Sequence, residues 1–277
     1  MKNTILNATE VLNGYDLVVS LYPHIPSMSH WRAWESAAYK RYQLSGRVLD
    51  LGCGDGQYFK LIWPAVEQVI GLDISPEVVA LGRASGVYEK VYLSAAHQVP
   101  EADASFDCVF ANCSLEHMDE LDKVIGEISR CLKPGGLLLC SVVTNRFVDW
   151  ATLPNLLDLS GFKDQAAIFR NDFLDYHHLV NPLTVQEWES RFDLAGLVLQ
   201  EHIPILPKWN SGLFLLVENL WHVKKENGGE MGDEIYSLLS QNVKFPAGFR
   251  QVLSGFLNME TDWLDCSGAV FKVTKPK

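Results

Sequence analysis

The chain has 277 residues and a formal net charge of −11, and 48% of its residues are hydrophobic. This length and apolar content suffice for a large buried core, in one domain with insertions or in two small domains. The acidic balance argues against a broad nucleic-acid-binding surface, because such surfaces are usually basic. None of the six cysteines forms a C-x-x-C pair, so we expect reduced, packed thiols and no metal site.

The first sixteen residues lack the apolar core of a signal peptide. The longest apolar runs are about seven residues, around 137–143, which is too short to span a bilayer. We therefore expect a cytoplasmic protein of bacterial type. Contact with a membrane surface and the oligomeric state remain open.

Residues 1–45 are predicted to form a helical N-terminal cap. Within residues 29–42, aromatic and apolar side chains recur at helical spacing, namely at Trp31, Trp34, Ala38 and Tyr42. Either this helix packs on a sheet, or Tyr22, Trp31 and Arg32 cover a substrate site.

Residues 48–62 carry the clearest functional signal. The apolar run 48–51 leads into Gly52, Gly54 and Gly56, and a helix-compatible segment follows at once. Glycine allows the chain to turn sharply and lets a ligand approach the backbone. The first amides of the next helix then point toward the same space. This pattern predicts a strand, a glycine loop and a helix that bind a nucleotide or nucleoside.

Spacing and charge separate the candidate ligands of this loop. A dinucleotide fingerprint would place its third glycine at Gln57, and a phosphate loop would need a Lys-Ser or Lys-Thr pair. The loop carries Asp50 and Asp55 and no base, so it suits an ammonium group better than a pyrophosphate. The pattern favours a ligand that is both nucleoside-like and amino-acid-like.

Further strands and helices follow in alternation. Segment 68–73 is a predicted strand that ends in Asp73, where a carboxylate can accept both ribose hydroxyls. Segments 106–112 and 137–143 are predicted strands, and residues 120–132 form an amphipathic helix between them. Such alternation implies parallel βα units with right-handed crossovers. A ligand would then bind at the carboxyl ends of the strands.

From residue 48 to residue 143 these segments resemble, in order, the successive motifs of class I S-adenosylmethionine (SAM)-dependent methyltransferases, of the type 11 methyltransferase domain family. The resemblance implies an α/β fold with a doubly wound, mostly parallel seven-stranded sheet and helical lid insertions, and SAM as cofactor. The family's acid beside adenine is missing, since Ala95-Ala96 stands there, so backbone around Ala96 and His97 would contact the base. The implied cofactor-binding residues are Asp50, Gly52, Cys53, Gly54, Asp55, Gly56, Asp73, Ile74, Ala96, His97, Asn112, Cys113 and Ser114.

Three histidines are candidate catalytic residues. His117 follows the predicted strand 106–112, and an imidazole can deprotonate a hydroxyl nucleophile near neutral pH; a structural or cofactor-side role is the alternative. His177 and His178 lie in the poorly patterned segment that follows the predicted strand 137–143. They invite a metal interpretation, but no third ligand stands at a recognised spacing, so none is assigned.

The resemblance divides the chain into six segments. These are an N-terminal cap (1–45), the SAM-binding core (46–144), a lid insertion (145–183), a core continuation (184–207), a helical insertion (208–265) and a final core strand (266–277). The expected function is methyl transfer to a small-molecule or glycan/lipid-type acceptor. The alternative is a non-catalytic SAM-binding partner or regulatory protein. A nicotinamide-dependent oxidoreductase is disfavoured by the glycine spacing and by the lack of a Tyr-x-x-x-Lys pair.

Overall fold

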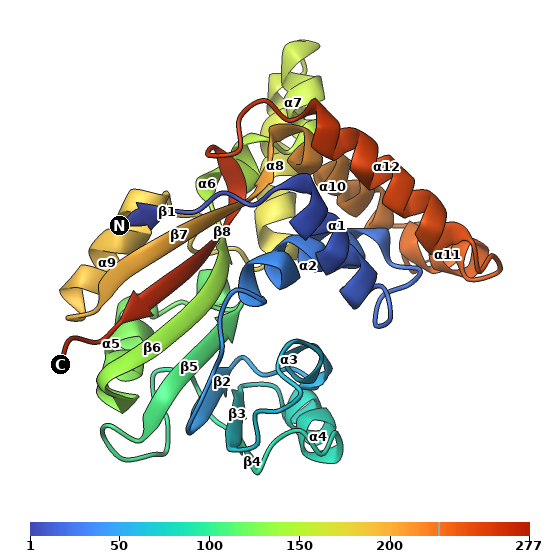
Figure 1. Cartoon of the computed structure of the whole chain (residues 1–277). Helices are drawn as coiled ribbons and strands as arrows, with labels where there is room; N and C mark the ends of the chain where they lie inside the picture. Colours follow the sequence, from blue (N-terminus) through green and yellow to red (C-terminus); the bar gives the residue numbers. More distant parts are fainter. Residues whose placement is uncertain (227) are drawn as a thin grey trace.

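The computed structural model describes residues 1–226 and 228–277, so Asn227, within the predicted 208–265 insertion, lies outside the described residues. One sheet runs through the molecule in the order β1-β7-β8-β6-β5-β2-β3-β4 (Figure 1). Its strands are β1 (Lys2–Asn3), β2 (Val48–Leu51), β3 (Val69–Asp73), β4 (Lys90–Leu93), β5 (Phe106–Asn112), β6 (Leu132–Val143), β7 (Val198–Pro207) and β8 (Cys266–Thr274).

The sheet is mostly parallel, as predicted. Among the described residues, only β8 pairs antiparallel, with β6 on one side and β7 on the other. The seven predicted strands are all present, and β1 adds an eighth at the edge, parallel to β7. Two residues are too few for any side-chain period, which is why the sequence does not reveal β1.

The central strands are buried on both faces, which explains their continuous apolar sequences. Successive side chains of a strand point to opposite faces. In β2, Val48 accordingly packs into one hydrophobic core and Leu49 into the other. This two-sided burial fixes the register of β2 at the centre of the sheet.

Helices cover both faces of the sheet (Figure 1). The core on one face includes side chains from α1 (Ala8–Val18), α2 (Pro26–Tyr39) and α3 (Gln57–Ile62). The core on the other face includes α5 (Leu121–Cys131) and α9 (Val185–Leu194). The remaining short elements near the glycine loop are α4 (Pro76–Ala84) and the 3-10 turn η1 (Leu115–His117).

Local capping signals explain where these helices begin. Ser75 accepts a hydrogen bond from the Val78 amide, and Pro76 occupies the first position of α4. Thr184 and Glu187 form a capping box at the start of α9. Both helices therefore begin where the local sequence supplies a side-chain cap.

The two segments outside the strand pattern are helical and lie together at one end of the molecule (Figure 1). Residues 145–183 contain α6 (Asn145–Asp149), α7 (Thr152–Leu159) and α8 (Lys163–Tyr176). Residues 208–265 contain α10 (Lys208–Trp221), α11 (Met231–Leu239) and α12 (Phe245–Met259). Helix α10 packs against α7, α2 and α12. Across the described ranges, every helix is too short or too polar to cross a bilayer.

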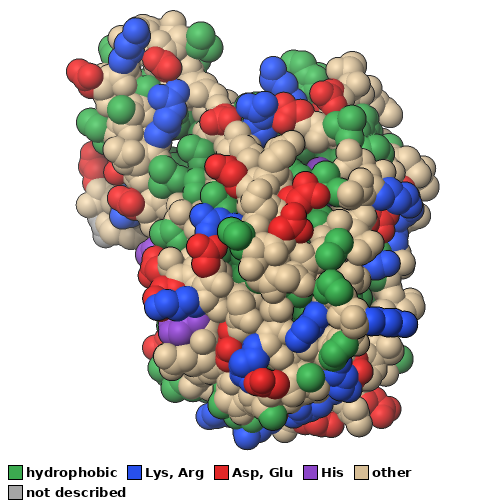
Figure 2. All heavy atoms as spheres, turned by 90° about the vertical axis from the view of Figure 1, so that its left-hand side faces the viewer, with side chains coloured by type: hydrophobic (Ala, Val, Ile, Leu, Met, Phe, Trp, Pro, Cys, Tyr) green, Lys and Arg blue, Asp and Glu red, His purple; other side chains and the backbone are tan. Residues whose placement is uncertain are grey.

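Charge is mixed over one face of the molecule (Figure 2). On the face shown in Figure 2, Lys and Arg side chains alternate with Asp and Glu side chains. That face therefore lacks the single-sign basic field that favours binding to nucleic acid.

Candidate functional site

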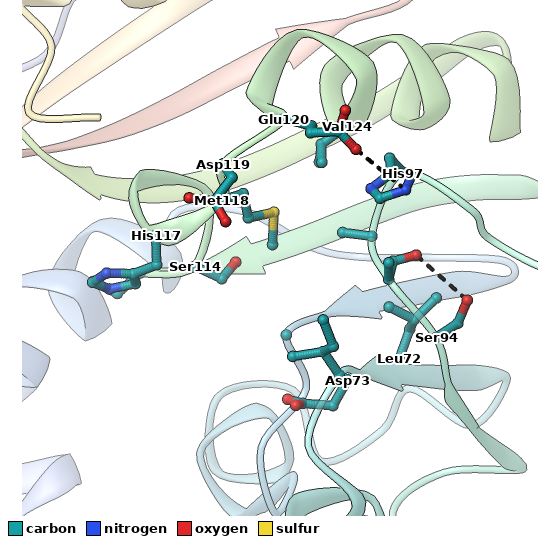
Figure 3. A pocket seen from close by; sticks show the side chains of 15 residues that line it. Leu72, Asp73, Ser94, His97, Ser114, His117, Met118, Asp119, Glu120 and Val124 are labelled. Atoms are coloured by element: carbon teal, nitrogen blue, oxygen red, sulfur yellow. Dashed lines mark hydrogen bonds and ion pairs between the residues drawn. The ribbon is translucent and has the colours of Figure 1, made fainter. Parts of the chain in front are cut away.

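A cavity of about 470 Å³ opens at the carboxyl ends of β2, β3 and β5 (Figure 3). The strand order reverses between β2 and β5, and open α/β sheets bind ligands at such a switch point. The cavity is lined by Gly52, Leu72, Asp73, Ile74, Ser94, Ala95, Ala96, His97, Cys113, Ser114, His117, Met118, Asp119, Glu120 and Val124. Eight of the residues assigned from the sequence are in this lining. They are Gly52, Asp73, Ile74, Ala96, His97, Cys113, Ser114 and His117.

The glycine loop keeps the cavity open. Gly52 has φ of +75°, and a Cβ atom on it would lie 2.8 Å from the Cβ atom of Ser114. Gly56 has φ of +77°, and a Cβ atom there would lie 2.7 Å from the Tyr88 ring. Both positions thus require glycine for conformation and for space. Any side chain at position 52 would press into the cavity wall.

Asp73 is held at the tip of β3 with its carboxylate toward the cavity (Figure 3). One oxygen accepts a hydrogen bond from the Ser75 amide (3.0 Å), and the other lies 3.4 Å from the Gly54 amide nitrogen. A carboxylate has about four acceptor positions, so acceptor capacity remains for a ligand diol. Beside it, the apolar side chain of Ile74 is 73% exposed, a surface that a flat base could cover.

The far side of the cavity is largely apolar. Ala95, Ala96, Met118 and Val124 contribute to it, and the imidazole of His97 lies 3.5 Å from a Glu120 carboxylate oxygen. A carboxylate with free acceptor capacity at one end and the apolar side chains of Ala95, Ala96, Met118 and Val124 at the other fit a nucleoside. The residues present therefore fit the nucleoside half of SAM.

Asp50, Cys53 and Asp55 lie outside the cavity lining. The Tyr88 hydroxyl donates to the buried Asp50 carboxylate (2.7 Å), and burial raises the pKa of Asp50 to about 7. The Cys53 thiol packs under the loop, while the exposed Asp55 accepts from the Gln57 amide (3.0 Å). In this structure these side chains support the glycine loop from behind. Any contact that they make with a ligand's amino-acid end stays a prediction.

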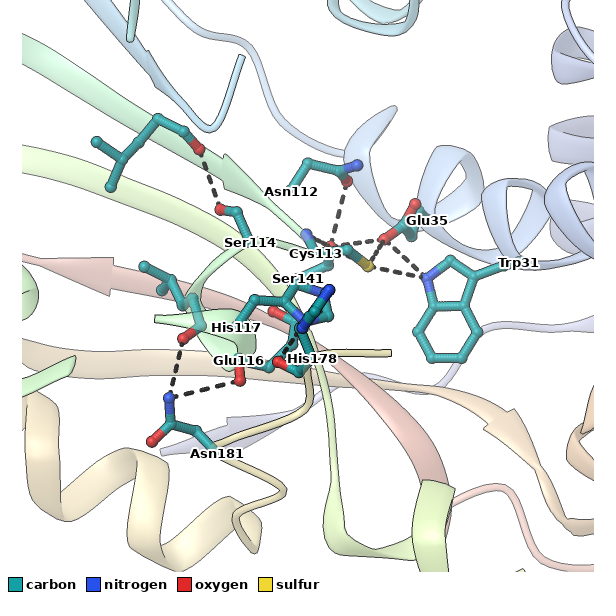
Figure 4. Close-up of polar contacts among 12 residues, drawn as sticks. Trp31, Glu35, Asn112, Cys113, Ser114, Glu116, His117, Ser141, His178 and Asn181 are labelled. Atoms are coloured by element: carbon teal, nitrogen blue, oxygen red, sulfur yellow. Dashed lines mark hydrogen bonds and ion pairs between the residues drawn. The ribbon is translucent and has the colours of Figure 1, made fainter. Parts of the chain in front are cut away.

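A buried polar network joins helix α2 to the end of β5 (Figure 4). The fully buried Glu35 accepts from the Trp31 indole (3.0 Å) and the Ser141 hydroxyl (2.6 Å), and it pairs with Arg32. The Cys113 thiol donates to the same carboxylate (3.0 Å). Sequence reasoning missed Glu35; its only signal is an acid four residues after Trp31 on an otherwise apolar helix face.

The same network positions Asn112 and the residue after it. The Asn112 side-chain oxygen accepts from the Tyr39 hydroxyl (2.8 Å) and lies 3.2 Å from the Ser141 hydroxyl oxygen, whose proton is donated to Glu35. Cys113 has φ of +46°, a conformation that is uncommon for a residue with a side chain and that often marks functional sites. Its amide donates to Ser141, which holds this turn at the cavity wall.

His117 is presented to the cavity as a neutral imidazole. Its Nδ1 lies 3.2 Å from the carbonyl oxygen of His178. Because a carbonyl only accepts, Nδ1 carries the proton and Nε2 is the basic nitrogen. Burial lowers the pKa of His117 below its ordinary value, so the ring is uncharged near pH 7. His178 itself has φ of +46° and contacts this site through its backbone, while His177 lies in a different cavity.

Glu116 is a buried carboxyl next to this imidazole. It is fully buried, and neither of its oxygens has a hydrogen-bond partner among the described residues. One oxygen lies 3.9 Å from Nε2 of His117. Burial raises the pKa of Glu116 to about 8, so the carboxyl is largely protonated at neutral pH.

This burial predicts how the stability of the ligand-free protein varies with pH. Between its ordinary pKa of 4.5 and its folded pKa of about 8, Glu116 is ionised when unfolded and protonated when folded. Raising the pH over that window therefore favours unfolding, by about 1.4 kcal/mol per pH unit. We expect the free energy of unfolding of Glu116→Gln, measured by urea titration at each pH, to fall less than that of wild type as the pH rises through this window. Glu77→Gln, on exposed α4 surface, is the control; parallel curves for wild type and Glu116→Gln would contradict the prediction.

Comparison with known proteins identifies the central part of the chain. Residues 49–140 match the family model described as a methyltransferase domain. Residues 49–140 are a methyltransferase domain. This segment contains β2 to β5 with their loops, and so almost all of the cavity lining. Class I methyltransferase domains of this kind take SAM as methyl donor, and the fold described above is theirs.

Curated relatives match a longer part of the chain than this domain. A ubiquinone biosynthesis O-methyltransferase from Xanthomonas oryzae is 29% identical over 160 residues, which cover 56% of this chain and 65% of that one. Across the first curated relatives the matched part is 36–65% of their length.

Solved structures show the same fold over nearly the whole chain. The 4+2 cyclase SpnF is 19% identical, with a TM-score of 0.55, over 100% of this chain and 99% of that one. A phosphoethanolamine N-methyltransferase 2 from Haemonchus contortus, solved with S-adenosylhomocysteine, is 19% identical, with a TM-score of 0.55, over 96% of this chain and 58% of that one. At these identities the likeness concerns the fold alone, and function depends on the site.

Proposed function

We propose that the protein transfers a methyl group from SAM to a small-molecule or glycan/lipid-type acceptor. The observation that carries the proposal is the cavity at the switch point of a methyltransferase domain, with Asp73 at one end and apolar surface at the other. The curated relative named for quinone O-methylation supports a small acceptor with a hydroxyl group.

Bound SAM supplies a sulfonium methyl that is already activated, so the protein's main task is alignment. In this proposal Asp73 holds the ribose hydroxyls, and Ile74 and Ala96 cover the adenine. Cys113 and Ser114 face the methionine half, on a turn held rigid by Glu35 and Ser141.

His117 is the proposed proton acceptor for a hydroxyl nucleophile. Its Nδ1–H is engaged by the His178 carbonyl, which leaves Nε2 free to accept a proton. Glu116 lies 3.9 Å from that nitrogen, but its carboxyl is largely protonated at neutral pH and therefore supplies no charge to the imidazolium. The backbone carbonyl of His178 is thus the group that orients the base.

Turnover tests the proposal directly. The protein is incubated with SAM and a panel of phenolic, quinol, glycoside and lipid acceptors, and S-adenosylhomocysteine is quantified. Acceptor-dependent formation of S-adenosylhomocysteine is the expected result. Binding of S-adenosylhomocysteine by calorimetry without any turnover would favour the alternative, a SAM-binding partner or regulatory protein. The cyclase with this fold is a reason to run both measurements.

The role of His117 predicts a pH profile. Because burial lowers the pKa of His117, the acidic limb of kcat should lie below the ordinary histidine pKa of about 6.5. His117→Gln should lower kcat roughly 100-fold or more and remove this limb, while affinity for S-adenosylhomocysteine changes little. The measurement is kcat from pH 5 to 9 (roughly the range in which an imidazole titrates), with His97→Gln as the control histidine of the same cavity. A large loss of cofactor affinity in His117→Gln would place this residue on the donor side instead.

A further inference from the structure

A second cavity, of about 560 Å³, lies between helices α7, α8 and α10. Both helical segments that form it lie outside the methyltransferase-domain match at 49–140. Its lining combines the aromatic and apolar side chains of Leu153, Phe169, Phe173 and Tyr176 with the carboxylates of Asp172, Asp175 and Glu218.

This second cavity is linked by a short run of contacts to the first cavity, the proposed SAM site, which we call the donor cavity. His177 lines the second cavity, and the next residue, His178, contacts His117 of the donor cavity through its carbonyl. The ring of His177 also packs edge-on against Phe147, which in turn packs against Trp31. The Trp31 indole lies 3.1 Å from the Cys113 thiol, in the wall of the donor cavity. The packed side chains of His177, Phe147 and Trp31 therefore connect the linings of the two cavities.

The polar groups of the second cavity are chiefly hydrogen-bond acceptors. Asp172 and Asp175 are exposed to solvent, and in the described parts of the chain their carboxylates make no hydrogen bond or ion pair with another protein group, as is also true of the ring nitrogens of His177. Burial lowers the pKa of His177 to about 4, which leaves its ring neutral and able to accept. The carboxylate of Glu218 pairs with Nε2 of His222. The other ring nitrogen of His222, Nδ1, lies 2.8 Å from a carboxylate oxygen of Glu230. Lys224 is the one lysine or arginine of the lining.

We propose that this second cavity binds the methyl acceptor, and that the acceptor presents hydrogen-bond donors, as hydroxyl or ammonium groups, on an apolar frame. Ionised carboxylates accept hydrogen bonds and cannot donate them, so they match hydroxyls or ammonium groups and repel anions. The aromatic side supplies area for the apolar frame, and aromatic faces also attract ammonium groups. This inference rests on the proposed function, because the reacting hydroxyl or amine of an acceptor bound in the second cavity must extend past His177 to reach His117.

Three probes that share a phenyl ring test whether the second cavity prefers hydroxyl, ammonium or phosphate groups. They are phenyl β-D-glucoside, phenethylammonium and phenyl phosphate. Dissociation constants are measured by calorimetry on the whole protein saturated with S-adenosylhomocysteine. We expect the glucoside or the ammonium probe to bind at least tenfold more tightly than the phosphate. Preference for the glucoside indicates a polyhydroxylated acceptor, and preference for phenethylammonium indicates an amine.

Matched variants test whether the probes bind in the second cavity. Leu153→Trp fills the cavity from α7 and should abolish probe binding, whereas Leu156→Trp, on the exposed face of the same helix, should not. Both variants should bind S-adenosylhomocysteine as wild type does, which shows that the fold is intact. The double variant Asp172→Asn/Asp175→Asn should lose the preference over phenyl phosphate, and it provides a second test if Leu153→Trp does not fold.

The inference is overturned if phenyl phosphate binds as well as the other probes, if Leu153→Trp leaves their binding unchanged, or if no probe binds while S-adenosylhomocysteine does. A wild-type protein that fails to bind S-adenosylhomocysteine would instead overturn the proposed function. The two failures are therefore distinguishable in one set of titrations.

Discussion

Asp73→Ala is expected to weaken binding of S-adenosylhomocysteine by about 1.5–3 kcal/mol, the usual worth of hydrogen bonds to a charged group. This corresponds to a roughly 10- to 150-fold rise in the dissociation constant. The reason is geometric, because Asp73 stands at the tip of β3 with acceptor capacity directed into the cavity. Isothermal titration calorimetry provides the measurement.

Two comparisons sharpen this result. Asp73→Asn keeps one oxygen to accept from the Ser75 amide, so it should retain the loop geometry and lose less affinity. Glu77→Ala, on the first turn of α4, removes a neighbouring acid that does not line the cavity and should bind as wild type does. If Asp73→Ala binds with unchanged affinity, the ribose is held by another residue.

Glu35→Ala is expected to destabilise the protein by about 3–5 kcal/mol, since it leaves the largely covered Arg32 side chain (16% exposed) without its fully buried charge partner. Glu35 also accepts hydrogen bonds from Trp31, Cys113 and Ser141, which would lose their common acceptor. The measurement is the free energy of unfolding from urea titration. Because these contacts hold the cavity wall, affinity for S-adenosylhomocysteine should fall as well.

A surface ion pair provides the control for Glu35. Asp16 pairs with Arg250 between α1 and α12, with both side chains substantially exposed. Exposed pairs contribute about 0–1 kcal/mol, so Asp16→Ala should change stability by no more than that. Similar losses in the two variants would show that Glu35 acts as an ordinary surface charge and that the buried network is unimportant.

Local sequence patterns were sufficient for much of the fold. The continuous apolar runs of β2 and β6 reflect burial on both faces, and their alternation with helices implied the parallel sheet that the structure shows. The capping residues Ser75 and Thr184 marked helix starts for local chemical reasons. Signals of this kind work because each arises within one turn or one strand.

The sequence by itself also located the first cavity, since Gly52, Asp73 and Ser114 each lie at or just beyond the end of a strand at the same edge of the sheet. Only the tertiary structure decided what surrounds it. Glu35 lies 78 residues from Cys113 along the chain, and their contact depends on how α2 packs on the sheet. The second cavity likewise requires α8 and α10, which are separated in the chain by α9 and β7. No local sequence period indicates that these two helices come together. The binding loop is encoded in a short stretch of chain, whereas the buried charges and the second cavity arise from long-range contacts between helices.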